Sequence, residues 1–229
     1  DTRSAVSDPD TPDRQEIIDM LLSIMMPSKD DVTITHQTTL YQSHSALNAF
    51  LDFLADYLIR GVICADKSVI FLVLQRMSKM YVACTDSEER KNWQCQIISL
   101  LTALPRSSYD NYDVLKLVEN SGMHRASLLL HQEEASLWPQ NEMTIERRAT
   151  HFCAAVECYL DDDDPEFRKE VFSYVKKECS GASDEKDQVT NLRDALITKL
   201  IDLVLLDALM TAELAADLFA DDPDQVIRS

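Results

Sequence analysis

Apolar residues recur at helical spacing in short segments separated by polar turns, and this pattern constrains the fold more than any other feature of the chain. Residues 110–122 predict a helix that ends at Gly122, residues 123–131 a second helix and residues 149–160 a third, and Asp164-Pro165 begins a fourth. Consecutive short amphipathic helices are typical of an α-solenoid, in which helical hairpins stack on one another. A solenoid supplies surface and length rather than a reaction centre, so the pattern favours a protein-binding role.

Helical spacing extends over most of the chain and predicts about ten helices, with no credible strand. An isolated helix of this length is marginal in water, so each one must bury its apolar stripe against a neighbour. We therefore expect an all-α fold, an α-solenoid of antiparallel helical hairpins. The expected helices cover approximately residues 12–26, 47–58, 69–81, 88–104, 110–122, 123–131, 145–160, 165–175, 188–206 and 212–219.

Cap residues predict where several of these helices begin and end. Thr11-Pro12 places a capping hydroxyl before a proline at the first helical position, and Thr85 with Glu88 has the spacing of a capping box. Gly122 and Gly181 directly follow apolar segments, where helix C-caps favour glycine.

The chain is expected to form one structural unit. Residues 1–10 are polar and expected to be flexible, whereas residues 11–229 are expected to form a single α-solenoid segment. Because the sequence begins at Asp1 without a methionine, we expect that segment to be part of a longer protein. The polar stretches 27–42, 132–144 and 178–187 are expected to be loops or connections.

The charge balance disfavours several kinds of partner. The chain carries 40 acidic and 22 basic residues, for a net charge of −18. That average charge would repel a nucleic-acid backbone and an anionic lipid surface. With only 3 glycines, the phosphate-binding loops of Rossmann and P-loop enzymes are also disfavoured. The acidic helix surfaces are expected to be solvated, or to attract a basic protein partner.

The six cysteines, at positions 64, 84, 95, 153, 158 and 179, contain no CxxC pair. Most occupy apolar or small-residue positions in expected helices, a pattern of reduced, buried thiols in the cytosol rather than of a disulfide framework. The longest apolar stretch, Leu200 to Leu209, contains two aspartates and is too short to span a membrane.

The run Asp161–Asp164 is the strongest chemical motif. Clustered carboxylates near a helix end can hold magnesium and a diphosphate, as in all-α isoprenoid synthases. Such an enzyme needs a second aspartate-rich motif on a facing helix, and Asp221-Asp222 is a poor candidate. The simpler interpretation is that these residues cap the helix after Pro165 and favour its positive N-terminus, by roughly 0.3–1 kcal/mol each.

His151, Cys153 and Cys158 are residue types that bind zinc, but a structural zinc site needs four ligands at matched spacing and no partner pair is present. We expect this segment to contribute to core packing. His124 and His131 are expected to be ordinary histidines at the polar edge of a helix. No serine is marked as a nucleophile, so no catalytic residue is expected.

Trp138-Pro139 lies in a polar connection and is the best local candidate for a partner contact, because exposed aromatic residues are common interface anchors. Packing of Trp138 onto its own hairpin is an equally good interpretation. No metal, cofactor or small-molecule site is expected.

Several segments resemble proteins of vesicle transport. Residues 149–160 are similar to helix B of the repeats of clathrin heavy chains and vacuolar-sorting proteins. Residues 14–25, 164–175 and 211–219 resemble, in the same order, segments of the solenoid in the vacuolar protein sorting-associated protein 8 family. The resemblance covers about half of the chain and consists of packing patterns rather than chemical motifs. Residues 27–46 and 132–147 have no counterpart in it.

That family provides the endosome-specific subunit of the CORVET tethering complex. The resemblance implies a β-propeller and a zinc-binding RING region elsewhere in the parent protein, with class C vacuolar-sorting core subunits and an early-endosomal Rab GTPase as partners. It implies a spacer and scaffold in endosomal fusion and in vacuolar or lysosomal protein transport, located in the cytoplasm and peripherally on the early endosome membrane. Two alternatives stay open: another solenoid scaffold of nuclear-pore, proteasome-lid or coat type, and an all-α enzyme that uses Asp161–Asp164.

Overall fold

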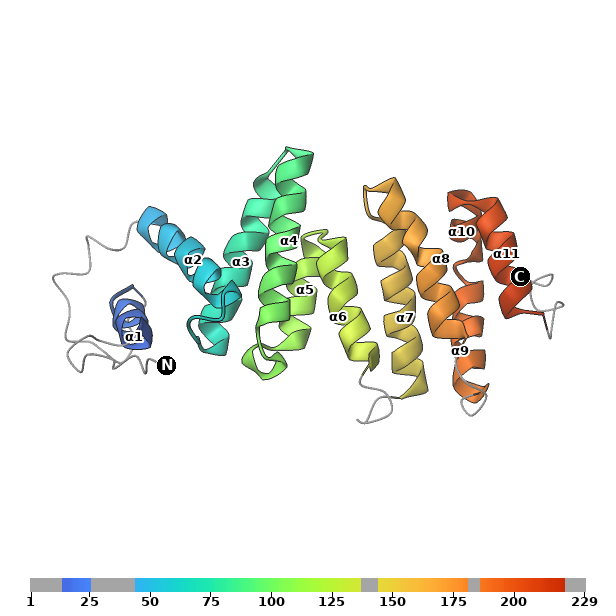
Figure 1. The fold of residues 1–229 in the computed structure, drawn as a ribbon, viewed down its shortest axis with the longest axis horizontal. Helices are drawn as coiled ribbons and strands as arrows, with labels where there is room; N and C mark the ends of the chain where they lie inside the picture. The colour runs from blue at the N-terminus through green and yellow to red at the C-terminus, as the bar shows by residue number, and fades with distance from the viewer. Residues whose placement is uncertain (1–13, 26–43, 137–143, 181–185, 221–229) are drawn as a thin grey trace, which may run out of the picture. The chain divides into compact units, whose positions relative to one another are not determined.

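The structure, a computed structural model, describes residues 14–25, 44–136, 144–180 and 186–220. These residues form eleven α-helices and one short 3₁₀ helix, with no strand among them, so the predicted all-α class is confirmed (Figure 1). The chain divides into two compact units, residues 1–117 and 118–229, and the boundary lies within α5 (Asn111–Asn120). No helix of the described part combines the length and the apolar character needed to cross a bilayer.

In the first unit, α2 (His44–Ile59), α3 (Lys67–Ala83) and α4 (Ser87–Ala103) pack on one another, and α3 and α4 lie side by side in Figure 1. Their apolar stripes are buried as the spacing predicts, and Leu54, Ile70 and Leu100 are 0 % exposed. The 3₁₀ helix η1 (Arg106–Ser108) follows α4.

The helix α1 (Arg14–Met25) is tied to the loop before α3 by a pair of hydrogen bonds. Gln15 Nε2 donates to the carbonyl oxygen of Cys64, and the Cys64 N–H donates to Gln15 Oε1, each at 2.9 Å. A single amide side chain therefore satisfies both backbone groups of Cys64.

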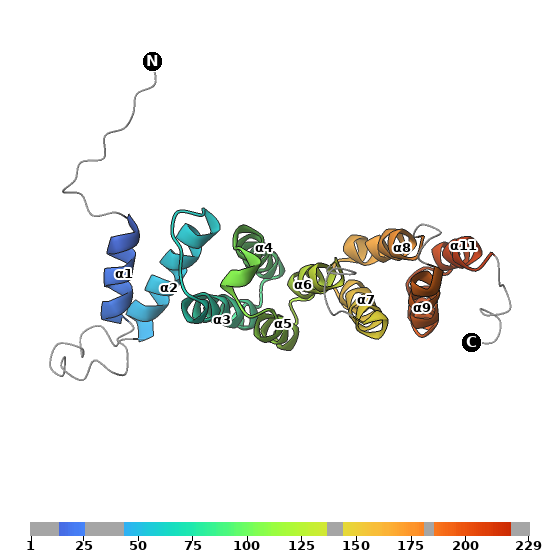
Figure 2. The same cartoon turned by 90° about the horizontal axis from the view of Figure 1, so that it is seen from below.

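The described part of the second unit is entirely helical apart from its turns. It comprises α6 (His124–Ser136), α7 (Ile145–Leu160), α8 (Pro165–Cys179), α9 (Lys186–Ile197), α10 (Leu200–Leu206) and α11 (Ala208–Leu218). The helix α7 packs on α6, α8 and α9, and Figure 2 shows α8 and α11 on one side of this unit with α7 and α9 on the other. Side chains from α7 to α11 share one core, which includes Phe152, Val156, Val171, Leu196, Leu203 and Leu214.

Aspartate side chains begin many of the described helices, because a carboxylate can accept the backbone N–H groups that the first turn leaves unpaired. The caps are Asp66 for α3, Asp86 for α4, Asp110 for α5, Asp164 for α8 and Asp207 for α11, with N–H to oxygen distances of 2.9–3.1 Å. Part of the acidic excess therefore has a structural role.

Several helix boundaries differ from the prediction, and α11 begins at Ala208 rather than near residue 212. The cap of α4 is Asp86, which accepts from the Glu89 N–H, so the predicted capping box of Thr85 and Glu88 is wrong by one residue. The helix α6 continues to Ser136, so the first part of the predicted connection 132–144 is helical. In the same way, α8 extends to Cys179 and shortens the predicted loop after it.

The predicted helix 188–206 is broken into α9 and α10. At the break, the N–H groups of Thr198 and Lys199 turn to the carbonyl oxygens of Ala195 and Leu196, and the Thr198 hydroxyl also donates to Ala195 at 2.7 Å. These bonds to the residue three positions earlier tighten the turn and end the regular helix.

Two glycines have positive φ. Gly122 follows α5 with φ of 67°, as its predicted C-cap role requires. Gly61 follows α2 with φ of 63°, in a turn outside the sequence-based predictions. The predicted cap at Thr11-Pro12, the loop 27–42 and Gly181 lie outside the described residues.

Candidate functional site

Trp138-Pro139, the partner contact predicted from the sequence, lies outside the described residues. Within the described part of the second unit, three features carry chemical or binding potential. They are the aspartate run, a buried histidine pair, and an exposed apolar face on α10.

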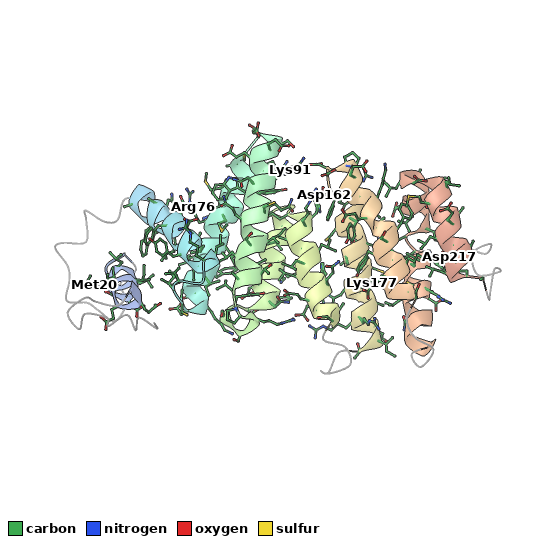
Figure 3. All side chains as sticks on the ribbon, viewed as in Figure 1. Met20, Arg76, Lys91, Asp162, Lys177 and Asp217 are labelled. Atoms are coloured by element: carbon green, nitrogen blue, oxygen red, sulfur yellow. The ribbon has the colours of Figure 1, made fainter. Side chains whose placement is uncertain are left out.

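Arg125 of α6 ties the aspartate run to the neighbouring hairpin. Its Nε and Nη2 donate to Asp162 at 3.0 and 3.1 Å, and Nη2 also donates to Asp164 at 3.0 Å. Asp162 is buried at the turn between α7 and α8 (Figure 3), and the guanidinium lies 4.2 Å from the centroid of the Phe167 ring. The hydrogen bonds with Asp162 and Asp164 raise the pKa of Arg125, and Arg125 lowers the pKa of Asp164.

These contacts define a structural role for most of the aspartate run. Asp161 ends α7, and Asp164 caps α8 by accepting from the Glu166 N–H at 3.1 Å, which confirms the capping prediction at that residue. Asp162 also accepts from the Asp164 N–H at 2.9 Å. Because Arg125 already occupies oxygens of two of these carboxylates, the geometry favours a helix junction over a magnesium site. Across the described residues, no cluster of three or more His, Cys, Asp or Glu side chains is placed to hold a metal ion.

His131 is buried, with 5 % of its surface exposed, and the prediction of an edge histidine is wrong for this residue. Its Nδ1 lies 3.0 Å from Nδ1 of His151, and its Nε2 lies 3.2 Å from Glu119 Oε1. One neutral arrangement satisfies both contacts: His131 donates to Glu119, and His151 donates to His131. Burial lowers the pKa of both imidazoles. The charges of Glu157 and Glu134 oppose this shift at His131, and those of Glu134 and Glu119 oppose it at His151. The pair therefore favours the neutral form in the folded protein.

The six cysteines differ in burial. Cys158 and Cys179 are buried, and burial raises the pKa of each thiol to about 12. Cys64 and Cys95 are exposed, so the prediction of buried thiols is wrong for them. Cys64 lies in the loop before α3 rather than on an apolar helical stripe. Cys153 is partly buried against the core, as predicted for its segment.

One face of α10 is apolar and exposed. Ile201, Val204 and Leu205 have exposed fractions of 72, 47 and 79 %, and Leu205 is the most exposed large apolar residue of the described chain. Spacings of three and four residues place them on one side of the helix, opposite the fully buried Leu203. Full burial of such a side chain stabilises by roughly 1.5–3 kcal/mol. A partner that covers this face would therefore gain binding free energy from each residue it buries. We call Ile201, Val204 and Leu205 the α10 face.

A cavity of about 390 Å³ adjoins the α10 face. Its walls include the apolar Leu160, Leu205 and Leu206 and the charged Asp161, Arg168 and Asp202. Lys199 also lines it, and its ammonium group is paired with Glu157 of α7. The cavity and the α10 face share Leu205, so one partner could contact both.

The sequence does not single out the α10 face, because Leu200, Leu203 and Leu206 continue the leucine spacing of the predicted helix 188–206 and account for its apolar character. The signal that could have revealed it is the composition of residues 200–206, which are apolar on every side except at Asp202. A helix that is apolar all round must be covered on all sides or present a face for binding.

No protein-family model matches this chain, and comparison with curated proteins and with solved structures gives no match either. The resemblance to vesicle-tethering proteins therefore remains the basis of a proposal.

Proposed function

We propose that this chain is a structural and protein-binding segment of an endosomal vesicle-tethering subunit, similar to the vacuolar protein sorting-associated protein 8 family. Its hairpins would stack as an α-solenoid that holds the membrane-recruiting end of the parent protein at a set distance from the core that handles SNARE proteins. The partners would be class C vacuolar-sorting core subunits and an early-endosomal Rab GTPase, and the location would be the cytoplasmic surface of early endosomes.

The exposed α10 face is the observation that supports a scaffold role most directly. The helices of the second unit bury their stripes on one another, yet Ile201 and Leu205 stay open to solvent. By contrast, the charged side chains of Arg125 and Asp162 in this unit are already paired with each other. An exposed apolar surface is typical of a protein-binding site. Charged side chains that already pair with each other for structural reasons are poor candidates for catalysis. The segments that resemble the tethering family lie on α1, α8 and α11. Apolar residues of α8 and α11 are buried in the core of the second unit.

Affinity capture of the full-length parent protein tests this proposal. We expect class C core subunits and an early-endosomal Rab to be recovered, and recovery to fall when the described hairpins are deleted. A tagged parent should also colocalise with early endosomes. Capture of neither partner class by the intact parent would refute the tethering function.

The identity of the flanking domains separates tethering from the other scaffold classes. A RING region on the C-terminal side supports the tethering family, whereas a winged helix of the PCI type supports a proteasome-lid-like scaffold. Recovery of nuclear-pore or proteasome components in the capture experiment would favour the second class.

A further inference from the structure

The charge distribution of α10 and α11 indicates what could cover the α10 face. From Leu200 to Leu218 the sequence contains four acidic residues and no lysine, arginine or histidine. The acidic residues are Asp202, Asp207, Glu213 and Asp217. Asp202 is exposed beside Ile201 on α10 and also lines the adjoining cavity. Glu213 and Asp217 line a separate cavity with Lys176, so Asp202 is the carboxylate that borders the α10 face itself. The cavity beside the face has the carboxylates of Glu157, Asp161 and Asp202 against the cations of Arg168 and Lys199, so its net charge is negative. An apolar face with a negative border is complementary to an apolar surface bordered by basic groups.

This complementarity argues against two other occupants. In a symmetric pair of copies, the same patch meets itself, so the Asp202 carboxylates of the two copies would be brought toward each other. An anionic membrane surface would likewise be repelled by these carboxylates. The two basic groups at the cavity change this little. Lys199 is paired with Glu157, and among the described residues that line the cavity Arg168 is the one cation without an ion pair.

We propose that the α10 face and the cavity beside it bind an amphipathic helix of another protein, with leucine-like side chains on one face and lysine or arginine along its edges. The apolar side of that helix would contact Ile201 and Leu205, and a basic residue would pair with Asp202. A helix in a groove is a common mode of peptide recognition, read through anchors three and four residues apart. This inference deepens the proposed scaffold function by naming the chemistry of a partner, and it rests on that function only for its biological purpose.

Peptide binding to the 229-residue chain tests the proposal. The probe is a synthetic amphipathic peptide of about 18 residues, made of leucine and lysine at helical spacing, and the matched probe replaces every lysine with glutamate. We expect saturable binding of the lysine peptide by fluorescence anisotropy and none of the glutamate peptide. Leu205→Glu should weaken binding by about tenfold or more. Asp202→Lys should weaken it too, and added salt should reduce the difference between Asp202→Lys and wild type.

Val82→Glu is the matched control for nonspecific attraction, since Val82 is an exposed residue of α3, outside this unit. It adds the same charge as Leu205→Glu. If the lysine peptide were attracted only by the negative charge of the protein, its binding would strengthen in both variants. If it docks on the α10 face, its binding weakens in Leu205→Glu alone. Circular dichroism verifies that both variants stay folded, which the exposure of the two positions predicts.

Three results would overturn the assignment. The first is equal binding of the lysine peptide by wild type and Leu205→Glu, or no binding at all. The second is concentration-dependent dimerisation that Leu205→Glu abolishes, which would make a second copy the occupant. The third is flotation with phosphatidylcholine–phosphatidylserine vesicles that depends on Leu205. All three results are measured on the 229-residue chain alone. They are therefore distinguishable from a failure of the parent protein to capture tethering partners.

Discussion

Arg125 and Asp162 are joined by two parallel hydrogen bonds, of 3.0 and 3.1 Å, that connect α6 to the turn between α7 and α8. Asp162 is 6 % exposed, whereas the Arg125 side chain is 26 % exposed and also contacts Asp164 and the ring of Phe167. One guanidinium thus neutralises a buried carboxylate and joins the start of one helix to the junction of the next two.

Loss of this guanidinium should destabilise the second unit. Arg125→Ala leaves the Asp162 carboxylate buried without its cationic partner, and we expect the free energy of unfolding to fall by about 2–3 kcal/mol, below the cost for a fully buried pair because Arg125 is partly exposed. Urea denaturation measures the change. The control is Arg60→Ala, which removes an exposed pair with Asp56 and should cost under about 1 kcal/mol. Equal losses in the two variants would contradict a special role for Arg125.

Stability should decrease as the pH falls below the ordinary histidine pKa of about 6.5. Burial lowers the pKa of His131 and His151 in the folded state, so the unfolded chain binds more protons in this range and the free energy of unfolding falls with pH. The stability that is linked to these two histidines is fully present above their unfolded-state pKa. It is lost as the pH falls below that value. The double variant His131→Gln/His151→Gln should lose less stability between about pH 7.5 and 5.5 than wild type does.

His124→Gln is the control for this pH dependence, because His124 lies on the same helix as His131 but is partly exposed. Chemical denaturation at a series of pH values gives the dependence for each protein. If the free energy of unfolding of the double variant changed with pH as much as that of wild type, the buried histidine pair would not be the cause of the pH dependence.

Removal of the carboxylate at Asp207 should loosen the start of α11. Its Oδ1 accepts from the N–H groups of Leu209 and Met210 at 3.1 and 3.0 Å, so Asp207→Ala should cost about 1 kcal/mol. Hydrogen exchange should accelerate at those two amides. Asp202→Ala removes a carboxylate that caps no backbone N–H of the described residues and should leave the exchange of Leu209 and Met210 unchanged. Unaltered exchange in Asp207→Ala would rule out the cap as a determinant of this junction.

The thiols should fall into distinct reactivity classes. Cys64 and Cys95 are exposed and should be alkylated by iodoacetamide in the folded protein. Cys158 and Cys179 have pKa values raised to about 12 by burial, so at pH 8 only about one thiol in ten thousand is ionised, and they should react only after unfolding. Mass spectrometry of the alkylated peptides resolves the four sites. Alkylation of Cys158 at the rate of Cys64 in native protein would mean that the core opens readily.

Helix existence could be predicted from this sequence because the apolar stripes are local signals. Leu54, Ile70 and Leu100 lie in the predicted helices 47–58, 69–81 and 88–104, and all three are fully buried. The break at Thr198 and Lys199 could not, because the stripe of Leu192, Leu196, Leu200 and Leu203 runs through it in phase and neither glycine nor proline marks it. The bond of the Thr198 hydroxyl to Ala195 is local, whereas the pairing of Lys199 with Glu157 of α7 depends on tertiary structure.

The chemistry of the second unit was harder to predict for the same reason. Asp164 as a cap follows from its position before Pro165, since the bonded N–H is two residues away. Arg125, in contrast, lies 37 residues before Asp162, and His131 lies 20 residues before His151. Nothing in the local sequence pairs these residues, so only the folded hairpins bring them together.

The length of α10 determines how its exposed surface can be detected. A helix from Leu200 to Leu206 is far too short to persist in water by itself, so the arrangement of Ile201 and Leu205 exists only while the surrounding hairpins hold it. A conformation-specific antibody to this epitope should recognise the native chain but fail on a denaturing blot. Immunisation with the excised linear peptide would not reproduce it.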